Sequence, residues 1–199
     1  MKRLNATAML LVLAAMASAV LADTIAYNVP AGTPGNQAFT GALGLDFNVN
    51  SDIVVTQLGV FDDNTDGLQA PLQARLYQRD DTNPCGFQLL ASIDFTLDDQ
   101  GTSLGDSSLF KPLDTPLVLP AGFTGTIVAS GYGPFEMNGN TNGGAPSWYT
   151  DDGGGLISFV GKGRFGAANT PGAYPMTVDG GPVNRYAAGT FIYHDAANP

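Results

Sequence analysis

The chain has 199 residues, of which 44% are hydrophobic and only 13% are charged, and 8 Lys and Arg residues stand against 18 Asp and Glu residues. The formal net charge of −10 argues against a nucleic-acid-binding protein, because such proteins need a basic face. The 26 Gly and 13 Pro residues argue against coiled coils and helical bundles. The ordinary apolar fraction argues against disorder.

The N-terminus has the pattern of a secretory signal peptide. A positively charged start precedes an uncharged run from Met9 to Ala22, and small residues stand one and three positions before Asp23. The run is shorter than the roughly 20 residues that a membrane-spanning helix needs. We therefore expect residues 1–22 to be removed and residues 23–199 to form one domain with no membrane span. The expected location is extracellular or at the cell surface, with the periplasm as an alternative.

Alternating apolar residues and turn signals predict a series of short strands along the rest of the chain. In chain order, the predicted strands are 24–29, 42–49, 52–61, 71–78, 87–95, 108–113, 116–119, 125–132, 156–160 and 189–194. The strongest is 52–61, which is rich in β-branched residues. In 87–95 the alternation predicts that one side of the strand carries Phe87, Leu89, Ala91, Ile93 and Phe95.

No stretch shows a helical stripe of apolar residues, so the predicted fold is all-β. We expect a single-domain antiparallel β-sandwich, with a jelly roll or a similar Greek-key arrangement as the preferred form. Residues 131–155 and 161–188 are too long for tight turns. Long segments of this kind inside a compact domain are often functional and otherwise mobile.

Four segments resemble a family of uncharacterised secreted bacterial proteins. The segments are GALGLDFNVNSDIVVTQLGVFDDNTDGL, LPAGFTGTIVASGYG, GGGLISFVGKGRFG and TVDGGPVNRYAAGTF, and they span most of residues 36–191. Members of that family often end in a PEP-CTERM sorting tail and are expected to be β-sandwiches. The resemblance implies a secreted β-sandwich and carries no activity with it. The sequence departs from the tailed members at its end, Ala197-Asn198-Pro199, where it lacks their apolar segment and basic residues.

The most specific local motif is an acidic turn between two predicted strands. Residues 62–67 read Asp-Asp-Asn-Thr-Asp-Gly, which fits the first half of a calcium-binding loop, D-x-N-x-D-G. Asp62, Asn64 and Asp66 offer oxygen ligands at alternate positions, as a hard cation requires. The twelfth position is Gln73 in place of the expected Glu, and the flanks are strands, so this is no EF-hand. A looser Ca²⁺ site and a plain Asp/Asn-rich turn both remain open.

Aromatic residues provide two candidate surfaces for a sugar. Trp148 and Tyr149 lie in the Gly-rich segment 131–155 and offer faces that can stack on a sugar ring. The alternative is that they hold this segment against the sandwich. Tyr77, between Arg75 and Arg79 on the outward side of its strand, is the second candidate, with a solvated strand face as the alternative.

Enzyme signatures are sparse. The chain has one His, His194, and one Cys, Cys85, so zinc lacks ligands and a Ser-His-Asp triad would have to use the terminal strand. No G-x-S-x-G, H-E-x-x-H or phosphate-binding loop is present. A glycosidase needs only two carboxylates, which makes a carboxylate-based glycoside hydrolase the least favoured of the functions considered.

The sequence therefore favours a secreted, non-catalytic β-sandwich that binds a glycan or a protein at the cell surface or in the extracellular matrix. Ca²⁺ is the one cofactor that it suggests. The alternative is a self-associating structural or filament protein in which residues 23–29 add as a strand to the sheet of a neighbouring copy.

Overall fold

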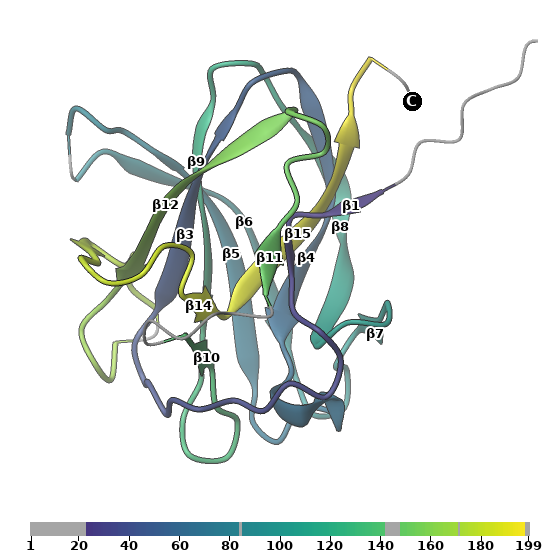
Figure 1. The fold of residues 1–199 in the computed structure, drawn as a ribbon, viewed down its shortest axis with the longest axis vertical. Helices are drawn as coiled ribbons and strands as arrows, with labels where there is room; N and C mark the ends of the chain where they lie inside the picture. The colour runs from purple at the N-terminus through teal and green to yellow at the C-terminus, as the bar shows by residue number, and fades with distance from the viewer. Residues whose placement is uncertain (1–22, 84, 142–147, 171, 198–199) are drawn as a thin grey trace, which may run out of the picture.

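The computed structural model describes residues 23–83, 85–141, 148–170 and 172–197, which form two antiparallel sheets packed face to face (Figure 1). The predicted signal peptide, residues 1–22, lies outside the described residues. Within the described ranges, no helix is long and apolar enough to cross a membrane. The all-β prediction is confirmed.

The two sheets contain five and six strands. The order in the five-stranded sheet is β1 (Thr24–Ile25), β15 (Gly189–Asp195), β4 (Ile53–Phe61), β8 (Ser108–Leu119) and β7 (Thr102–Ser103). The order in the six-stranded sheet is β13 (Thr177–Val178), β12 (Ile157–Phe165), β3 (Leu43–Val49), β9 (Thr124–Ser130), β5 (Leu72–Arg79) and β6 (Phe87–Phe95). Two small ladders pair β2 (Tyr27–Asn28) with β11 (Tyr149–Thr150), and β10 (Gly139–Asn140) with β14 (Tyr186–Ala187).

The strand order is that of a jelly roll. The series β1-β15-β4-β8 forms one of its four-stranded sheets and β3-β9-β5-β6 forms the other. Strand β12 is an addition, because it pairs with the outer edge of β3 and extends the second sheet. The preferred form of the predicted sandwich is thus confirmed.

The core lies between the sheets and is built from the inward residues of the alternating strands. Phe47 of β3 and Phe191 of β15 meet there, with ring centroids 4.8 Å apart and neither side chain exposed. Gly125 of β9 lies against Phe47, since a Cβ atom at that position would fall 2.3 Å from the ring. The absence of a side chain at Gly125 therefore leaves the space that this ring fills.

Several predicted elements need correction. The two predicted strands 108–113 and 116–119 form one strand, β8, which runs through Pro112 and Pro116. The predicted first strand, 24–29, is divided into β1 and β2, which pair with different partners. The segments 131–155 and 161–188 are not structureless, because they contain β10, β11, β13, β14 and the last part of β12.

The predicted side of Phe87 and Leu89 was wrong. The pairing of β5 with β6 shifts register between Leu76 and Tyr77, so that Leu76 faces Ala91 while Tyr77 faces Leu89. One extra residue in β6 turns the start of the strand over. Phe87 and Leu89 therefore lie on the outer side of the sheet, with 39% and 48% of their surfaces exposed.

Candidate functional site

The outer face of the six-stranded sheet carries a cluster of three aromatic rings. Tyr174, from the segment between β12 and β13, stacks on Phe87 with ring centroids 4.3 Å apart and an interplanar angle of 9°. Tyr77 meets both rings edge to face, at 5.0 Å from Tyr174 and 6.1 Å from Phe87. Tyr77, Arg75 and Arg79 are buried, so they form neither the exposed sugar surface predicted for Tyr77 nor its alternative, a solvated strand face. Phe87 is the most exposed of the three rings.

Phe87 lines two hollows, with volumes of about 320 Å³ and 460 Å³. The same five residues line both hollows, namely Arg79, Asp80, Asp81, Gly86 and Phe87. The smaller one, here called the Phe87 pocket, is completed by Arg164, Tyr174, Met176 and Val178. Met176 and Val178 are also largely exposed. The sheet therefore presents an aromatic and apolar surface beside charged side chains.

Two arginines have different roles at this pocket. Arg79 is buried, and it donates hydrogen bonds to the carbonyl oxygens of Phe47 and Gly125, to Asn48 Oδ1 and to the Asp81 carboxylate. These contacts involve all three of its nitrogens, so Arg79 holds the sheet together.

Arg164 contacts the pocket from β12. Its Nε lies 2.7 Å from both carboxylate oxygens of Asp46, and its guanidinium carbon lies 5.6 Å from the centre of the Tyr174 ring. Its two terminal nitrogens have no hydrogen-bond partner among the described residues. These N–H groups can donate to a ligand.

Two carboxylates, Asp80 and Asp81, also line the pocket. Hydrogen bonds from the Thr82 side chain and main chain hold the pKa of the Asp80 carboxyl below its ordinary value. Asp81, whose side chain is 58% exposed, forms an ion pair with Arg79 at 2.8 Å. Carboxylates can accept hydrogen bonds from hydroxyl groups of a ligand.

The other predicted aromatic site has a different setting. Trp148 is half-buried and packs against the core, where its ring lies beside Gly139. Tyr149 pairs through its main chain with Asn28. This packing fits the alternative interpretation that Trp148 holds its segment against the sandwich, and a sugar-binding role for Trp148 and Tyr149 stays a prediction.

The acidic turn connects β4 to β5 through a short 3₁₀ turn, η1 (Asp63–Thr65). The Asp62 carboxylate accepts a hydrogen bond from the Gly67 N–H through Oδ2, at 3.1 Å. The Asn64 side-chain amide donates to Asp63 Oδ1 at 2.8 Å. Among the described residues, no three His, Cys, Asp or Glu side chains are grouped so that they could hold a metal ion. A site built on Asp62, Asn64 and Asp66 has two carboxylates and one amide, and it stays a prediction.

Sequence analysis missed Glu136, the single Glu of the chain, which the fold brings to this turn. The Glu136 side chain is fully buried and accepts hydrogen bonds from the N–H groups of Asp63, at 2.8 Å, and Gln69, at 2.7 Å. Burial raises the pKa of the Glu136 carboxyl to about 7, with a smaller contribution from the negative charges of Asp62 and Asp63. Nothing in the local sequence around Glu136 indicates a partner 67 or 73 positions earlier.

This burial predicts that the protein loses stability as the pH rises. The folded state holds the Glu136 proton up to about pH 7, whereas the unfolded chain releases it near its ordinary pKa. Between these limits the unfolded state binds fewer protons. The free energy of unfolding should therefore fall by up to about 1.4 kcal/mol per pH unit from pH 5 to pH 7. Urea titrations in EDTA measure this slope. Glu136→Gln should flatten it, and an equal slope in the variant would contradict the assignment.

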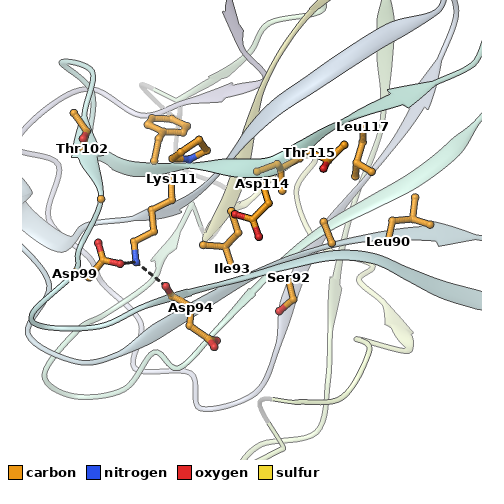
Figure 2. A pocket seen from close by; sticks show the side chains of 15 residues that line it. Leu90, Ser92, Ile93, Asp94, Asp99, Thr102, Lys111, Asp114, Thr115 and Leu117 are labelled. Carbon is orange, nitrogen blue, oxygen red and sulfur yellow. Dashed lines mark hydrogen bonds and ion pairs between the residues drawn. The ribbon is translucent and has the colours of Figure 1, made fainter.

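A larger hollow lies between β6 and β8 (Figure 2). It measures about 810 Å³, and Leu90, Ile93 and Leu117 line it. Lys111 also lines this hollow. Its ammonium group donates a hydrogen bond to the Asp94 carbonyl oxygen at 2.8 Å and forms an ion pair with the Asp99 carboxylate. Pro112 and Pro116 lie on the β8 edge, and they weaken that edge as a template for a further strand because proline has no N–H.

Two comparisons with known proteins gave no relative. The sequence matches no protein-family model, and no curated protein matches it. The candidate function therefore depends on the geometry of the outer sheet face and of the acidic turn.

Proposed function

We propose that this protein is a secreted, non-catalytic β-sandwich that binds an extracellular glycan on the outer face of its six-stranded sheet. The observation that carries the proposal is the exposure of Phe87, which lines two hollows. A large aromatic side chain whose ring is backed by Tyr174 and left open to solvent is a suitable surface for the apolar face of a sugar ring.

The polar groups around Phe87 fit the same ligand. Sugar hydroxyl groups both donate and accept hydrogen bonds, and the pocket offers carboxylates at Asp80 and Asp81 and N–H donors at Arg164. The carboxylates follow β5 in its connection to β6, and the guanidinium belongs to β12 of the same sheet. A small number of placed polar groups beside an aromatic surface is the usual composition of a small-molecule site.

Self-association is the less supported candidate. Its proposed donor segment, residues 23–29, already pairs within the chain through β1 with β15 and through β2 with β11. Ala26, Tyr27 and Val29 of this segment are buried in the core. Transfer of the segment to a neighbouring copy would break these contacts first, so the glycan proposal needs less rearrangement.

Glycan binding is tested with a panel of hexasaccharides from cellulose, xylan, laminarin, mannan and chitin, measured by isothermal titration calorimetry on the purified protein. We expect at least one to bind, and we expect Phe87→Ala to weaken it about ten-fold or more, because stacking contributes roughly 1 kcal/mol beyond the lost contact area. Phe135→Ala is the matched control, since Phe135 is 78% exposed and lies outside both hollows.

The proposal fails if no glycan of the panel binds, or if Phe87→Ala binds as tightly as the unaltered protein. It also fails if Phe135→Ala weakens binding as much as Phe87→Ala does. Loss of binding in Trp148→Ala alone would assign the site to the aromatic pair predicted first from the sequence.

A further inference from the structure

A group of four carboxylates surrounds the turn between β4 and β5. Asp62, Asp63 and Asp66 belong to the turn, and Glu136 reaches it from the segment between β9 and β10. Burial raises the pKa of the Asp62 carboxyl, and the charges of Asp66 and Asp63 raise it as well. Burial likewise raises the pKa of Glu136, with contributions from the charges of Asp62 and Asp63. Asp62 is therefore close enough to the other three carboxylates to be repelled by them when they are ionised.

Protein cations do not compensate this charge in the described part of the chain. The ion pairs found there join Arg79 to Asp81, Lys111 to Asp99, Arg164 to Asp46, Arg185 to Asp179 and His194 to Asp23. None of these pairs includes a carboxylate of the turn. Buried carboxylates without a counter-charge are costly, and protonation or a bound cation relieves the cost.

Glu136 and Asp63 use both of their carboxylate oxygens as hydrogen-bond acceptors, whereas Asp62 uses one. Both oxygens of Glu136 accept from main-chain N–H groups, and both oxygens of Asp63 accept from the N–H groups of Gly35 and Met137 and from Asn64. Asp66 ends the turn. Asp63 and Glu136 thus anchor the turn to its neighbours, which leaves Asp62 as the buried carboxylate with capacity to spare.

Asp62 Oδ1 supplies the decisive observation. The Asp62 residue is only 2% exposed, and Oδ1 is buried and has no hydrogen-bond partner among the described residues, while Oδ2 accepts from Gly67. A buried carboxylate oxygen without a donor is a rare and costly arrangement. It is also the arrangement that a missing ligand of opposite charge would leave.

We propose that the turn binds one divalent cation, with Asp62 Oδ1 as its buried ligand and with the side-chain oxygens of Asn64 and Asp66 as further ligands. The Asn64 amide nitrogen donates to Asp63, which leaves its carbonyl oxygen available. Hard oxygen ligands of mixed charge, completed by main-chain carbonyls and water, suit Ca²⁺ better than Mg²⁺, because Ca²⁺ accepts irregular geometry and more ligands. This site is separate from the proposed glycan pocket.

The test uses EDTA-treated full-length protein and CaCl₂ alone, followed by isothermal titration calorimetry and by the thermal unfolding midpoint, with MgCl₂ in a parallel series. We expect one calcium site, a midpoint that rises with CaCl₂, and weaker binding of Mg²⁺. Asp62→Asn keeps the shape and the bond from Gly67, and we expect it to weaken calcium binding about ten-fold or more.

Asp106→Asn is the matched control. Asp106 is also buried, at 3% exposure, and its Oδ2 has no partner among the described residues, but no neighbouring carboxylate affects its pKa. We expect this variant to keep the calcium site. The inference is overturned if the unaltered protein shows neither heat nor a midpoint shift in millimolar CaCl₂. It is also overturned if Asp62→Asn binds as tightly as the unaltered protein, or if Asp106→Asn loses binding equally. Because no glycan is present, a failure here leaves the proposed function unaffected.

Discussion

Replacement of Arg79 by Met is expected to lower the free energy of unfolding by about 3–5 kcal/mol. The substitution removes the donors to the main-chain oxygens of Phe47 and Gly125, which belong to the neighbouring strands β3 and β9. It also removes the ion pair with Asp81 and the hydrogen bond to Asn48. Met fills much of the vacated volume, so the loss reports chiefly the unsatisfied oxygens. Urea denaturation measures the difference.

Arg79→Lys is the graded control for this prediction. Lysine keeps the positive charge but presents a single ammonium in place of the planar guanidinium fork that contacts β3, β9 and Asp81. We expect Arg79→Lys to lower the free energy of unfolding by less than Arg79→Met does. Equal stability of Arg79→Met and the unaltered protein would show that Arg79 does not hold β3, β5 and β9 together.

Replacement of Phe47 by Ala is expected to destabilise the protein by about 3–5 kcal/mol, because it leaves a cavity between the sheets. The Phe47 ring is fully buried and contacts Phe191 of the opposite sheet and Phe123, with ring centroids 4.8 Å and 6.4 Å away. Gly125 lies flat against it and cannot fill the space. Thermal unfolding and urea denaturation both measure the loss.

Phe87→Ala is the matched control, since it removes the same ring from the outer side of the same sheet. We expect it to cost less than about 1.5 kcal/mol, because Phe87 is 39% exposed and its loss removes mainly the contact with Tyr174. A cost as large as that of Phe47→Ala would make Phe87 a structural residue and would weaken the case for a binding surface. A small loss of stability in Phe87→Ala, together with lost glycan binding, would show that Phe87 serves binding and not the stability of the fold.

The central strands of the sandwich could be predicted from the sequence because their side chains alternate between a buried and a polar side. The predicted range 87–95 coincides with β6, the ranges 42–49 and 52–61 begin one residue before β3 and β4, and the range 71–78 is offset from β5 by one residue. Local alternation failed where backbone irregularities intervene. Strand β12 continues to Phe165 through a register shift between Phe159 and Gly163, and no residue pattern marks that continuation.

The candidate glycan site depends on features of the tertiary structure that no local sequence pattern indicates. Phe87 reaches the outer face only because β6 carries an extra residue opposite Leu76 and Tyr77. Tyr174 covers Tyr77 because the segment after β12 folds back across the sheet. The outward direction of Tyr77 was predictable from the period of its strand, but its burial was not.

The acidic turn was also predictable only in part. The order of Asp62, Asn64 and Asp66 followed from the motif and predicted a turn between two strands, which η1 between β4 and β5 confirms. The contribution of Glu136 could not be predicted from the sequence, because its hydrogen-bond partners Asp63 and Gln69 lie in a distant part of the chain. Composition indicated only that carboxylates are plentiful.

The most direct test of the glycan proposal is a crystal structure of the protein with the tightest-binding hexasaccharide of the panel. The account predicts a sugar ring stacked on the exposed face of Phe87, with hydroxyl groups within hydrogen-bond distance of Asp80, Asp81 or the terminal nitrogens of Arg164. A glycan seated on Trp148, or in the hollow between β6 and β8, with the Phe87 face left open to solvent, would contradict it.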